Sequence, residues 1–520
     1  MRVSRRALLG AGLGLAGGAV LGTAGCADDP AGQTARVFRS DRPLPERFVV
    51  PLTTPPVKRP TARDGTATRY TVVQRPAQVE ILPGVLTDVW GYDGLFPGPT
   101  LRARRGERVV VTHHNDLPVP TVVHLHGGHT PAASDGFPTD LVLPAGPAAT
   151  SRTGHGGMPH GAGDVRRGTR EHVYPGDQPA ATLWYHDHRM DFTAPQVWRG
   201  LAGFHLVSDD VEDALPLPHG ERDVPLMIMD RSFGADGELR YPSLDASLAG
   251  PPGVSADHTS GVLGDVLLVN GRPWPVLAVA AARYRLRLLN ASNARRYDLA
   301  LDPVPPQGPA FVQVASDGGL LAAPVAHDHV PLAPAERYEV LVDFGAYPVG
   351  TEVTLTNALG TGPTDAVMRF RVVRRAREDS TVPARLAAVP TLRPRRDAPR
   401  RTWRFARGRT GTGHWLINDA LFDPARTDAT VRLGDIEVWR FASDLHHPVH
   451  VHLAPFQVLS RGGRDPGAFD VGWKDTLDLR PGEHADVAVR FPAHPGRYLV
   501  HCHNLEHEDM GMMATFATVA

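Results

Sequence analysis

Residues 501–512 read HCHNLEHEDMGM and place one cysteine among three histidines and two methionines. In an extended strand successive side chains point to opposite faces, so the two histidines that flank Cys502 share one face while the thiol occupies the other. One tripeptide can therefore contact two metal sites. A trigonal set of one cysteine and two histidines with a weak axial methionine is the geometry of blue-copper centres, and Cys502, His507 and Met512 supply three of these four ligands. The alternative, a half-buried strand with incidental histidines, does not explain this combination.

Pairs of histidines separated by one residue recur along the chain. By the same period of two, each pair can present two imidazoles from one strand face. Imidazole binds copper, iron, nickel and zinc, so the pairs alone do not select a metal, whereas a thiolate and a thioether select copper. His447, three residues before His450, can complete a mononuclear site. The pairs, which supply eight imidazoles for a metal cluster, are His124 and His126, His186 and His188, His450 and His452, and His501 and His503.

Five longer segments add a family resemblance to these residues. They are WYHDH at 184–188, LVNG at 268–271, LAPAERY at 332–338, GWKDT at 472–476 and EHEDM at 506–510. With the histidine pairs, they make residues 45–520 resemble the multicopper oxidases, and more narrowly the branch of bacterial laccases, spore-coat laccases and bilirubin oxidases. The resemblance implies an all-β chain of three cupredoxin-like domains, each a Greek-key β-barrel or sandwich.

The resemblance also implies how the ligands divide among four copper ions. The type 1 copper is expected to bind His447, Cys502, His507 and Met512. The type 2 copper is expected to bind His124 and His450. The two type 3 coppers are expected to bind His126, His186 and His503, and His188, His452 and His501, respectively. His446 competes for the type 1 position, and the His-Pro-x-His-x-His spacing favours His447 instead.

The composition agrees with a strand-rich globular protein. The chain has 520 residues, enough for about three domains of ordinary size. Its 53 glycines and 49 prolines suit short strands joined by turns and stay below the range of disordered chains. With 55 basic and 56 acidic residues the formal net charge is -1, so the charge balance favours neither nucleic acid nor an anionic membrane as a partner. The two cysteines are Cys26, in the N-terminal leader, and Cys502, which excludes a disulfide framework.

The first 27 residues predict export. Residues 4–9 read SRRALL and precede a Gly/Ala-rich apolar stretch, the pattern of a twin-arginine signal. An ordinary secretory signal or a membrane anchor is the alternative. Residues 23–26, TAGC, resemble a lipoprotein cleavage site, so Cys26 is a candidate for a lipid anchor, the sole membrane contact expected. No later segment approaches the roughly 20 apolar residues of a transmembrane helix, and we expect an extracellular, cell-envelope or periplasmic location.

Composition and strand patterns divide the chain into six parts. Apolar and alternating segments such as RVVVT at 108–112 predict strands, whereas arginine and proline dominate 374–402. Because histidine pairs from both ends of the chain are needed for one cluster, the first and third domains must meet. The predicted parts are an export signal at 1–27, a tail at 28–65, cupredoxin-like domains at 66–210 and 211–373, an Arg/Pro-rich linker at 374–402, and a third cupredoxin-like domain with the type 1 copper at 403–520.

Several other histidines are interpreted as non-ligands. His327 and His329 repeat the His-x-His spacing, but they lack partner motifs and are expected in a Pro-flanked loop. The histidines at 113–114 precede an Asn-Asp-Leu run and are expected at a strand end. Residues 144–170 form a Gly-rich insertion with two histidines, which we expect to be a mobile loop rather than a metal site.

These sites predict an oxidase. A donor is expected to give single electrons to the type 1 copper through an exposed edge of His507, and the covalent route from Cys502 to its two neighbouring histidines leads to the copper cluster. The resemblance implies that four such transfers reduce dioxygen to two waters, with metal and ligand geometry carrying the chemistry. Asp135, in the run SDG, and Glu508, beside His507, match positions where the family places proton-handling carboxylates. Their alternative roles are a turn residue and a solvated charge.

The electron donor is the least determined partner. Outer-sphere transfer requires access and a suitable potential, so phenols, aminophenols and bilirubin-like compounds all qualify. Cuprous-ion oxidation is the alternative, but the nine methionines form no Met-rich insert. A non-catalytic copper-binding cupredoxin protein is expected to have lost ligands, and a zinc hydrolase needs only three protein ligands and an open position.

Overall fold

The computed structural model describes residues 34–520, except residue 66 and the ranges 147–162 and 409–413. The predicted export signal, with Cys26, and most of the Gly-rich insertion therefore lie outside the described residues. Strands make up most of the regular secondary structure of the described chain, so the all-β prediction is confirmed. No helix of the described part is long and apolar enough to cross a membrane. The α-helices are α1 (Thr193–Arg199), α2 (Asp210–Asp213) and α3 (Leu505–Asp509).

The first pair of sheets encloses a core to which both sheets contribute, including Val72, Val111 and Leu183. One sheet has the order β10-β6-β3-β2, with β4 also paired to β3, and the other has the order β5-β12-β11-β7. The strands are β2 (Ala62–Asp64), β3 (Ala67–Glu80), β4 (Leu86–Tyr92), β6 (Arg108–Asn115) and β10 (Thr169–Tyr174), and β5 (Leu101–Arg104), β7 (Val123–His126), β11 (Ala181–Asp187) and β12 (Ala202–Ser208).

The second pair encloses the largest apolar core, which includes Leu288, Val340 and Phe370. Its sheets have the orders β17-β16-β13-β19-β24-β21-β22, with β14 paired to β13, and β18-β26-β25-β20-β23. The strands of the first sheet are β13 (Asp223–Phe233), β14 (Leu239–Arg240), β16 (Val266–Val269), β17 (Arg272–Pro273), β19 (Arg283–Asn290), β21 (Phe311–Ser316), β22 (Gly319–His327) and β24 (Arg337–Asp343). Those of the second are β18 (Val276–Ala281), β20 (Tyr297–Asp302), β23 (His329–Leu332), β25 (Glu352–Asn357) and β26 (Ala366–Arg375).

The third pair encloses a core of tryptophans, phenylalanines and valines that also contains Cys502 and Met512. Its sheets have the orders β28-β27-β30-β34-β32 and β29-β36-β35-β31-β33. The strands of the first are β27 (Arg400–Arg407), β28 (Trp415–Ile417), β30 (Ile436–Ser443), β32 (Gln457–Arg461) and β34 (His484–Arg490). Those of the second are β29 (Ala429–Arg432), β31 (His447–Val451), β33 (Thr476–Leu479), β35 (Gly496–Cys502) and β36 (Met513–Val519).

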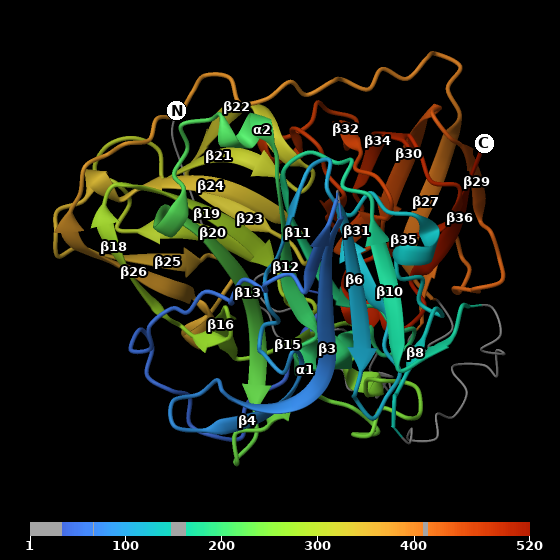
Figure 1. The fold of residues 1–520 in the computed structure, drawn as a ribbon, viewed down its shortest axis with the longest axis horizontal. Helices are drawn as coiled ribbons and strands as arrows, with labels where there is room; N and C mark the ends of the chain where they lie inside the picture. The colour runs from blue at the N-terminus through green and yellow to red at the C-terminus, as the bar shows by residue number, and fades with distance from the viewer. Residues whose placement is uncertain (1–33, 66, 147–162, 409–413) are drawn as a thin grey trace, which may run out of the picture.

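The three sheet pairs lie against one another, with the second, in yellow and green, and the third, in orange and red, on opposite sides of the view (Figure 1). The first and third pairs meet where α1 packs on α3 through Ala194, Val197 and Leu505. The Asp509 carboxylate fixes this contact because it accepts hydrogen bonds from two N–H groups at the start of α1, at 2.8 Å each. Two small parallel sheets pair β1 (Arg36–Val37) with β15 (Val262–Leu263) and β8 (Val142–Leu143) with β9 (Arg166–Arg167).

The placement predicted for His327 and His329 is wrong. His327 ends β22 and His329 begins β23, so both belong to strands rather than to a Pro-flanked loop. His327 is held there because its ring stacks on Phe469 at 4.0 Å and its Nε2 lies 2.9 Å from the Gln313 side-chain oxygen. His329 pairs with Asp298, so both histidines have partners within the second sheet pair.

Candidate metal centres

A first group of ligand atoms forms around Cys502. The sulfur lies 3.5 Å from Nδ1 of both His447 and His507, and the two nitrogens lie 3.2 Å apart. His447 begins β31 and Cys502 ends the neighbouring strand β35, while His507 lies in α3. All three side chains are fully buried. The structure thus brings together three of the four residues predicted for the type 1 position.

The turn after β35 explains how residues five apart converge. The Asn504 side chain caps α3 by accepting a hydrogen bond from the His507 backbone N–H at 3.4 Å. At Met512 the chain turns back to lie beside the end of β35. The Met512 backbone N–H donates a hydrogen bond to the His507 carbonyl, and the Met512 carbonyl accepts one from the Cys502 backbone N–H. The buried Met512 side chain lies in the same apolar core as Cys502.

The prediction that one edge of the His507 imidazole is exposed is wrong. The His507 side chain is fully buried, and its outer nitrogen, Nε2, lies 3.1 Å from the carbonyl oxygen of Ser260. The indole of Trp415 stacks on the imidazole with ring centres 3.6 Å apart. A segment from the second sheet pair therefore covers the position where direct contact with a donor was predicted.

The eight paired imidazoles form a second group, between the first and third sheet pairs. They lie on β7, β11, β31 and β35 or directly after those strands. Rings from the two sheet pairs stack on each other, His124 on His452 at 3.9 Å and His126 on His450 at 3.6 Å. Three sets have ligand atoms within 4.8 Å of one another, namely His124, His126 and His450, then His126, His186 and His503, and finally His188, His452 and His501. The last two sets coincide with those expected for the type 3 ions.

The buried nitrogens of this group fit a metal cluster. Buried polar atoms normally have hydrogen-bond partners, yet six of these imidazoles have a buried ring nitrogen without one. Burial lowers the pKa of these six rings, to about 3 in His186 and about 4 in His188, so they are neutral and keep a lone pair for a metal. The atoms without a hydrogen-bond partner are Nε2 of His124, His186 and His450, Nδ1 of His126, and both ring nitrogens of His188 and His503.

The donor set around Cys502 fits copper. Burial raises the pKa of the Cys502 thiol well above its usual value, so the sulfur keeps its proton until a thiophilic metal displaces it. A thiolate, two imidazoles and a thioether form the ligand set of blue-copper centres.

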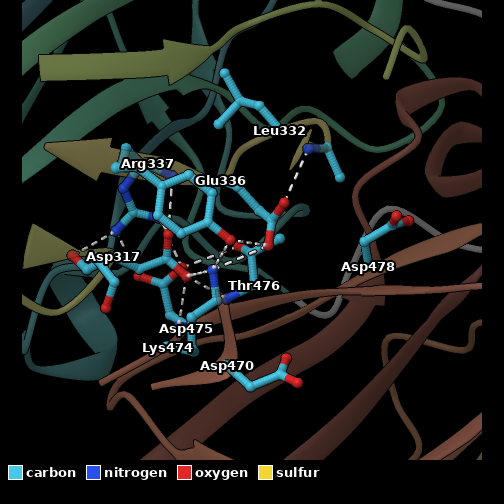
Figure 2. Close-up of polar contacts among 12 residues, drawn as sticks. Asp317, Leu332, Glu336, Arg337, Asp470, Lys474, Asp475, Thr476 and Asp478 are labelled. Atoms are coloured by element: carbon cyan, nitrogen blue, oxygen red, sulfur yellow. Dashed lines mark hydrogen bonds and ion pairs between the residues drawn. The ribbon is translucent and has the colours of Figure 1, made fainter. Parts of the chain in front are cut away.

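Contacts behind the ligands fix the orientation of the rings, as in other metal sites. The Asp475 carbonyl accepts from Nδ1 of His450 at 2.9 Å, and the Asp475 carboxylate lies 3.1 Å from Nε2 of His126. Arg337 in turn holds that carboxylate through two hydrogen bonds of 2.7 and 2.6 Å. Figure 2 shows this pair within a buried network that includes Asp317 and Lys474.

The two predicted proton-handling carboxylates lie against the ligand rings. One oxygen of Asp135 is 2.7 Å from Nδ1 of His452, and burial raises the pKa of this carboxyl well above its usual value. The Glu508 oxygens lie 3.4 Å from Nδ1 of His188 and 3.2 Å from Nδ1 of His501. Burial alone raises the pKa of Glu508, but the neighbouring His188 and His501 lower it overall. Both side chains are buried, so Glu508 is not a solvated loop charge.

Sequence patterns did not reveal three residues of these centres. Asp475 belongs to the quoted GWKDT segment, whose aspartate could have been singled out as a partner of the ligands. No sequence pattern indicates that Ser260 and Trp415 contact His507, because both lie in distant parts of the chain.

Comparisons with known proteins agree with this geometry. The multicopper oxidase family models match residues 74–152 and 389–520. A laccase from Bacillus subtilis (strain 168) is 36% identical, over 90% of this chain and 98% of the relative. A bilirubin oxidase from Albifimbria verrucaria is 35% identical, over 91% of this chain and 81% of the relative. A solved laccase structure from Pediococcus acidilactici superposes with a TM-score of 0.80 at 32% identity, over 93% of this chain and 96% of that chain.

Proposed function

The chain belongs to the multicopper oxidase family, and we propose that it takes single electrons from small organic donors and uses them to reduce dioxygen to water. Its three sheet pairs correspond to cupredoxin-like domains, and membership makes it a copper oxidoreductase acting on dioxygen. One observation carries the proposal: the thiol of Cys502 belongs to one ligand group while the imidazoles of His501 and His503 belong to the other.

Four copper ions are proposed for these positions. His447, Cys502, His507 and Met512 are proposed to bind the type 1 ion. The eight paired imidazoles are proposed to bind the type 2 ion and the two type 3 ions, with the same division among the ions as the sequence predicts. Copper bound there supplies the one-electron chemistry and the place where dioxygen is reduced. The orphaned, neutral imidazole nitrogens and the buried thiol support this assignment.

The protein contributes position and connection. The peptide that joins Cys502 to His501 and His503 links the two ligand groups through covalent bonds alone. Asp475 and its partner Arg337 hold His126 and His450 in place. Asp135 and Glu508 are proposed to hold and deliver protons, supported by their contacts with Nδ1 of His452 and with Nδ1 of His501.

Organic donors are favoured because relatives that this chain matches over 98% of their length are named laccase, and one that it matches over 81% is named bilirubin oxidase. Phenols, aminophenols and bilirubin-like compounds are the proposed donors, with cuprous-ion oxidation as the alternative outcome.

Oxygen uptake tests this function. The copper-loaded protein should consume dioxygen with phenols, aminophenols or bilirubin as donors. Uptake with cuprous ions and with none of the organic donors would assign cuprous oxidation instead. Absence of uptake with every donor would refute the oxidase function.

Export is proposed on the sequence of the leader alone. The twin-arginine pathway moves folded chains, and Cys26 is proposed to carry a lipid. Cell fractionation tests both points, since replacing Arg5 and Arg6 by lysine should retain the protein in the cytoplasm. With both arginines intact, Cys26→Ala should release the exported protein from the membrane fraction.

A further inference from the structure

Residues 255–263, which we term the type 1 cap, cover His507. The cap runs from a 3-10 turn, Ala256–His258, to β15. It belongs to the second sheet pair in sequence but lies over a ligand group of the third. Because the His507 side chain has 0% exposure, no donor can touch the imidazole while the cap stays in this position.

The cap occupies the outer nitrogen of His507. Nδ1 faces the sulfur of Cys502, so Nε2 is the nitrogen that points away from the ligand group. Nε2 donates to the carbonyl of Ser260 at 3.1 Å, and the Asn504 side-chain N–H donates to the same carbonyl at 3.1 Å. The Ser260 oxygen therefore takes the place that the oxygen of a phenol would need to contact His507.

Trp415 closes one face of the same ring. Its indole stacks on His507, and its Nε1–H donates to the carbonyl of Thr259, the cap residue before Ser260, at 2.7 Å. The guanidinium of Arg407 lies 5.7 Å from the Trp415 ring centre. The face and the outer edge of the imidazole are thus both screened by groups that contact each other.

The cap is anchored on both sides. The Val262 N–H donates to the buried Glu506 carboxylate at 3.2 Å, and the Tyr241 hydroxyl donates to the same carboxylate at 2.8 Å. β15 also pairs with β1 on the other side. Gly261 adopts φ +127°, and a Cβ there would lie 2.7 Å from the Cβ of Ala294 and 2.8 Å from that of Ala35. The packing thus leaves no room for a side chain beneath the cap.

We propose that the type 1 cap determines donor specificity by keeping donors one peptide away from His507. Electrons then cross the Ser260 peptide or the Trp415 indole, so reagents that react without contact are favoured over phenols that bind through their hydroxyl group. A phenol that reacts gives one electron to the type 1 position and its hydroxyl proton to water. The inference rests on the proposed function.

Two variants loosen the cap in different ways, and each has a matched control. Gly261→Ala inserts a methyl group beneath the cap, and Tyr241→Phe removes one hydrogen bond to its anchor. Gly350→Ala imposes similar backbone strain at φ +97°, where no heavy atom lies within 4 Å of the added Cβ. Tyr284→Phe removes a hydroxyl that accepts from the Ala280 N–H, within the second sheet pair.

The readout is a ratio of two rate constants. Anaerobic stopped-flow mixing measures how fast 2,6-dimethoxyphenol and hexacyanoferrate(II) bleach the blue absorption of the copper-loaded protein. At least one cap variant that keeps this absorption should raise the phenol-to-hexacyanoferrate ratio by about fivefold, as expected when a net hydrogen bond is lost. The controls should leave the ratio unchanged. In the copper-free protein, amide hydrogen exchange across 255–263 should be slow and should speed up in the same variant.

The inference is overturned if neither cap variant raises the ratio, whether because the ratio stays at the wild-type value or because both lose the blue absorption. Exchange of residues 255–263 in the wild-type copper-free protein at the rate of exposed loops would overturn it as well. Failure of the proposed function looks different, since the wild-type protein would then consume no dioxygen with any donor.

Discussion

The Asp135 carboxylate lies 2.7 Å from Nδ1 of His452, although 317 positions separate the two residues. Asp135 follows β7 in the first sheet pair, and His452 follows β31 in the third. The backbone carbonyl of Asp135 also lies 2.5 Å from Nδ1 of His124, a ligand candidate from its own sheet pair. One residue therefore holds imidazoles from both halves of the cluster.

Asp135→Ala should slow dioxygen reduction by about 100-fold, because positioned proton donors contribute roughly that much or more. The blue absorption should persist, since Asp135 does not contact the group around Cys502. Steady-state oxygen uptake and the visible spectrum measure both. Asp177→Asn, at an exposed carboxylate that pairs with His129, is the control. Loss of the blue absorption in Asp135→Ala would contradict the assigned role.

Glu508→Ala should give the same pattern by removing the carboxylate between His188 and His501. Reduction of the type 1 position by donors should stay at the wild-type rate, while its reoxidation by dioxygen slows. Stopped-flow spectroscopy separates the two phases. Slower reduction with normal reoxidation would argue for a role at the type 1 side instead.

Arg337→Met should destabilise the copper-free protein by about 3–5 kcal/mol, because it leaves the buried Asp475 carboxylate without its partner. His126 and His450 then lose the support of Asp475, so the copper content should fall as well. Urea denaturation and metal analysis are the measurements. Arg369→Met, at a partly exposed pair with Glu352, should cost no more than about 1 kcal/mol. Equal effects of the two substitutions would contradict this account of the network.

Glu339 should make stability depend on pH. Burial raises its pKa, but Arg285 and Arg287 lower it overall, to about 2. A lowered pKa gives stability that is complete above the unfolded value near 4.5 and is lost as the pH falls through about 2. The wild-type advantage over Glu339→Gln in the copper-free protein should therefore be largest above about pH 5 and shrink towards pH 2. A constant difference in denaturation free energy over that range would contradict the prediction.

The ligand residues could be predicted from the sequence because their spacing is local. A period of two identifies each histidine pair, and the segment from Cys502 to Met512 carries most of one ligand set within a single turn. The cap could not be predicted in this way, since Ser260 and His507 lie 247 positions apart and a backbone carbonyl leaves no trace in the side-chain pattern. The same limit applies to Arg337 and Asp475, which meet across 138 positions. His327 and His329 are predicted in a loop from their flanking prolines, whereas strand pairing places them at the ends of β22 and β23.

Metal analysis with visible spectroscopy of the wild-type protein and Cys502→Ser tests the central claim most directly, because Cys502 is the residue that joins the two ligand groups. The wild-type protein should hold about four copper ions per chain and absorb as a blue-copper protein, while Cys502→Ser should keep about three and lose the blue absorption. Zinc in place of copper, a single copper ion per chain, or blue absorption that survives Cys502→Ser would contradict it.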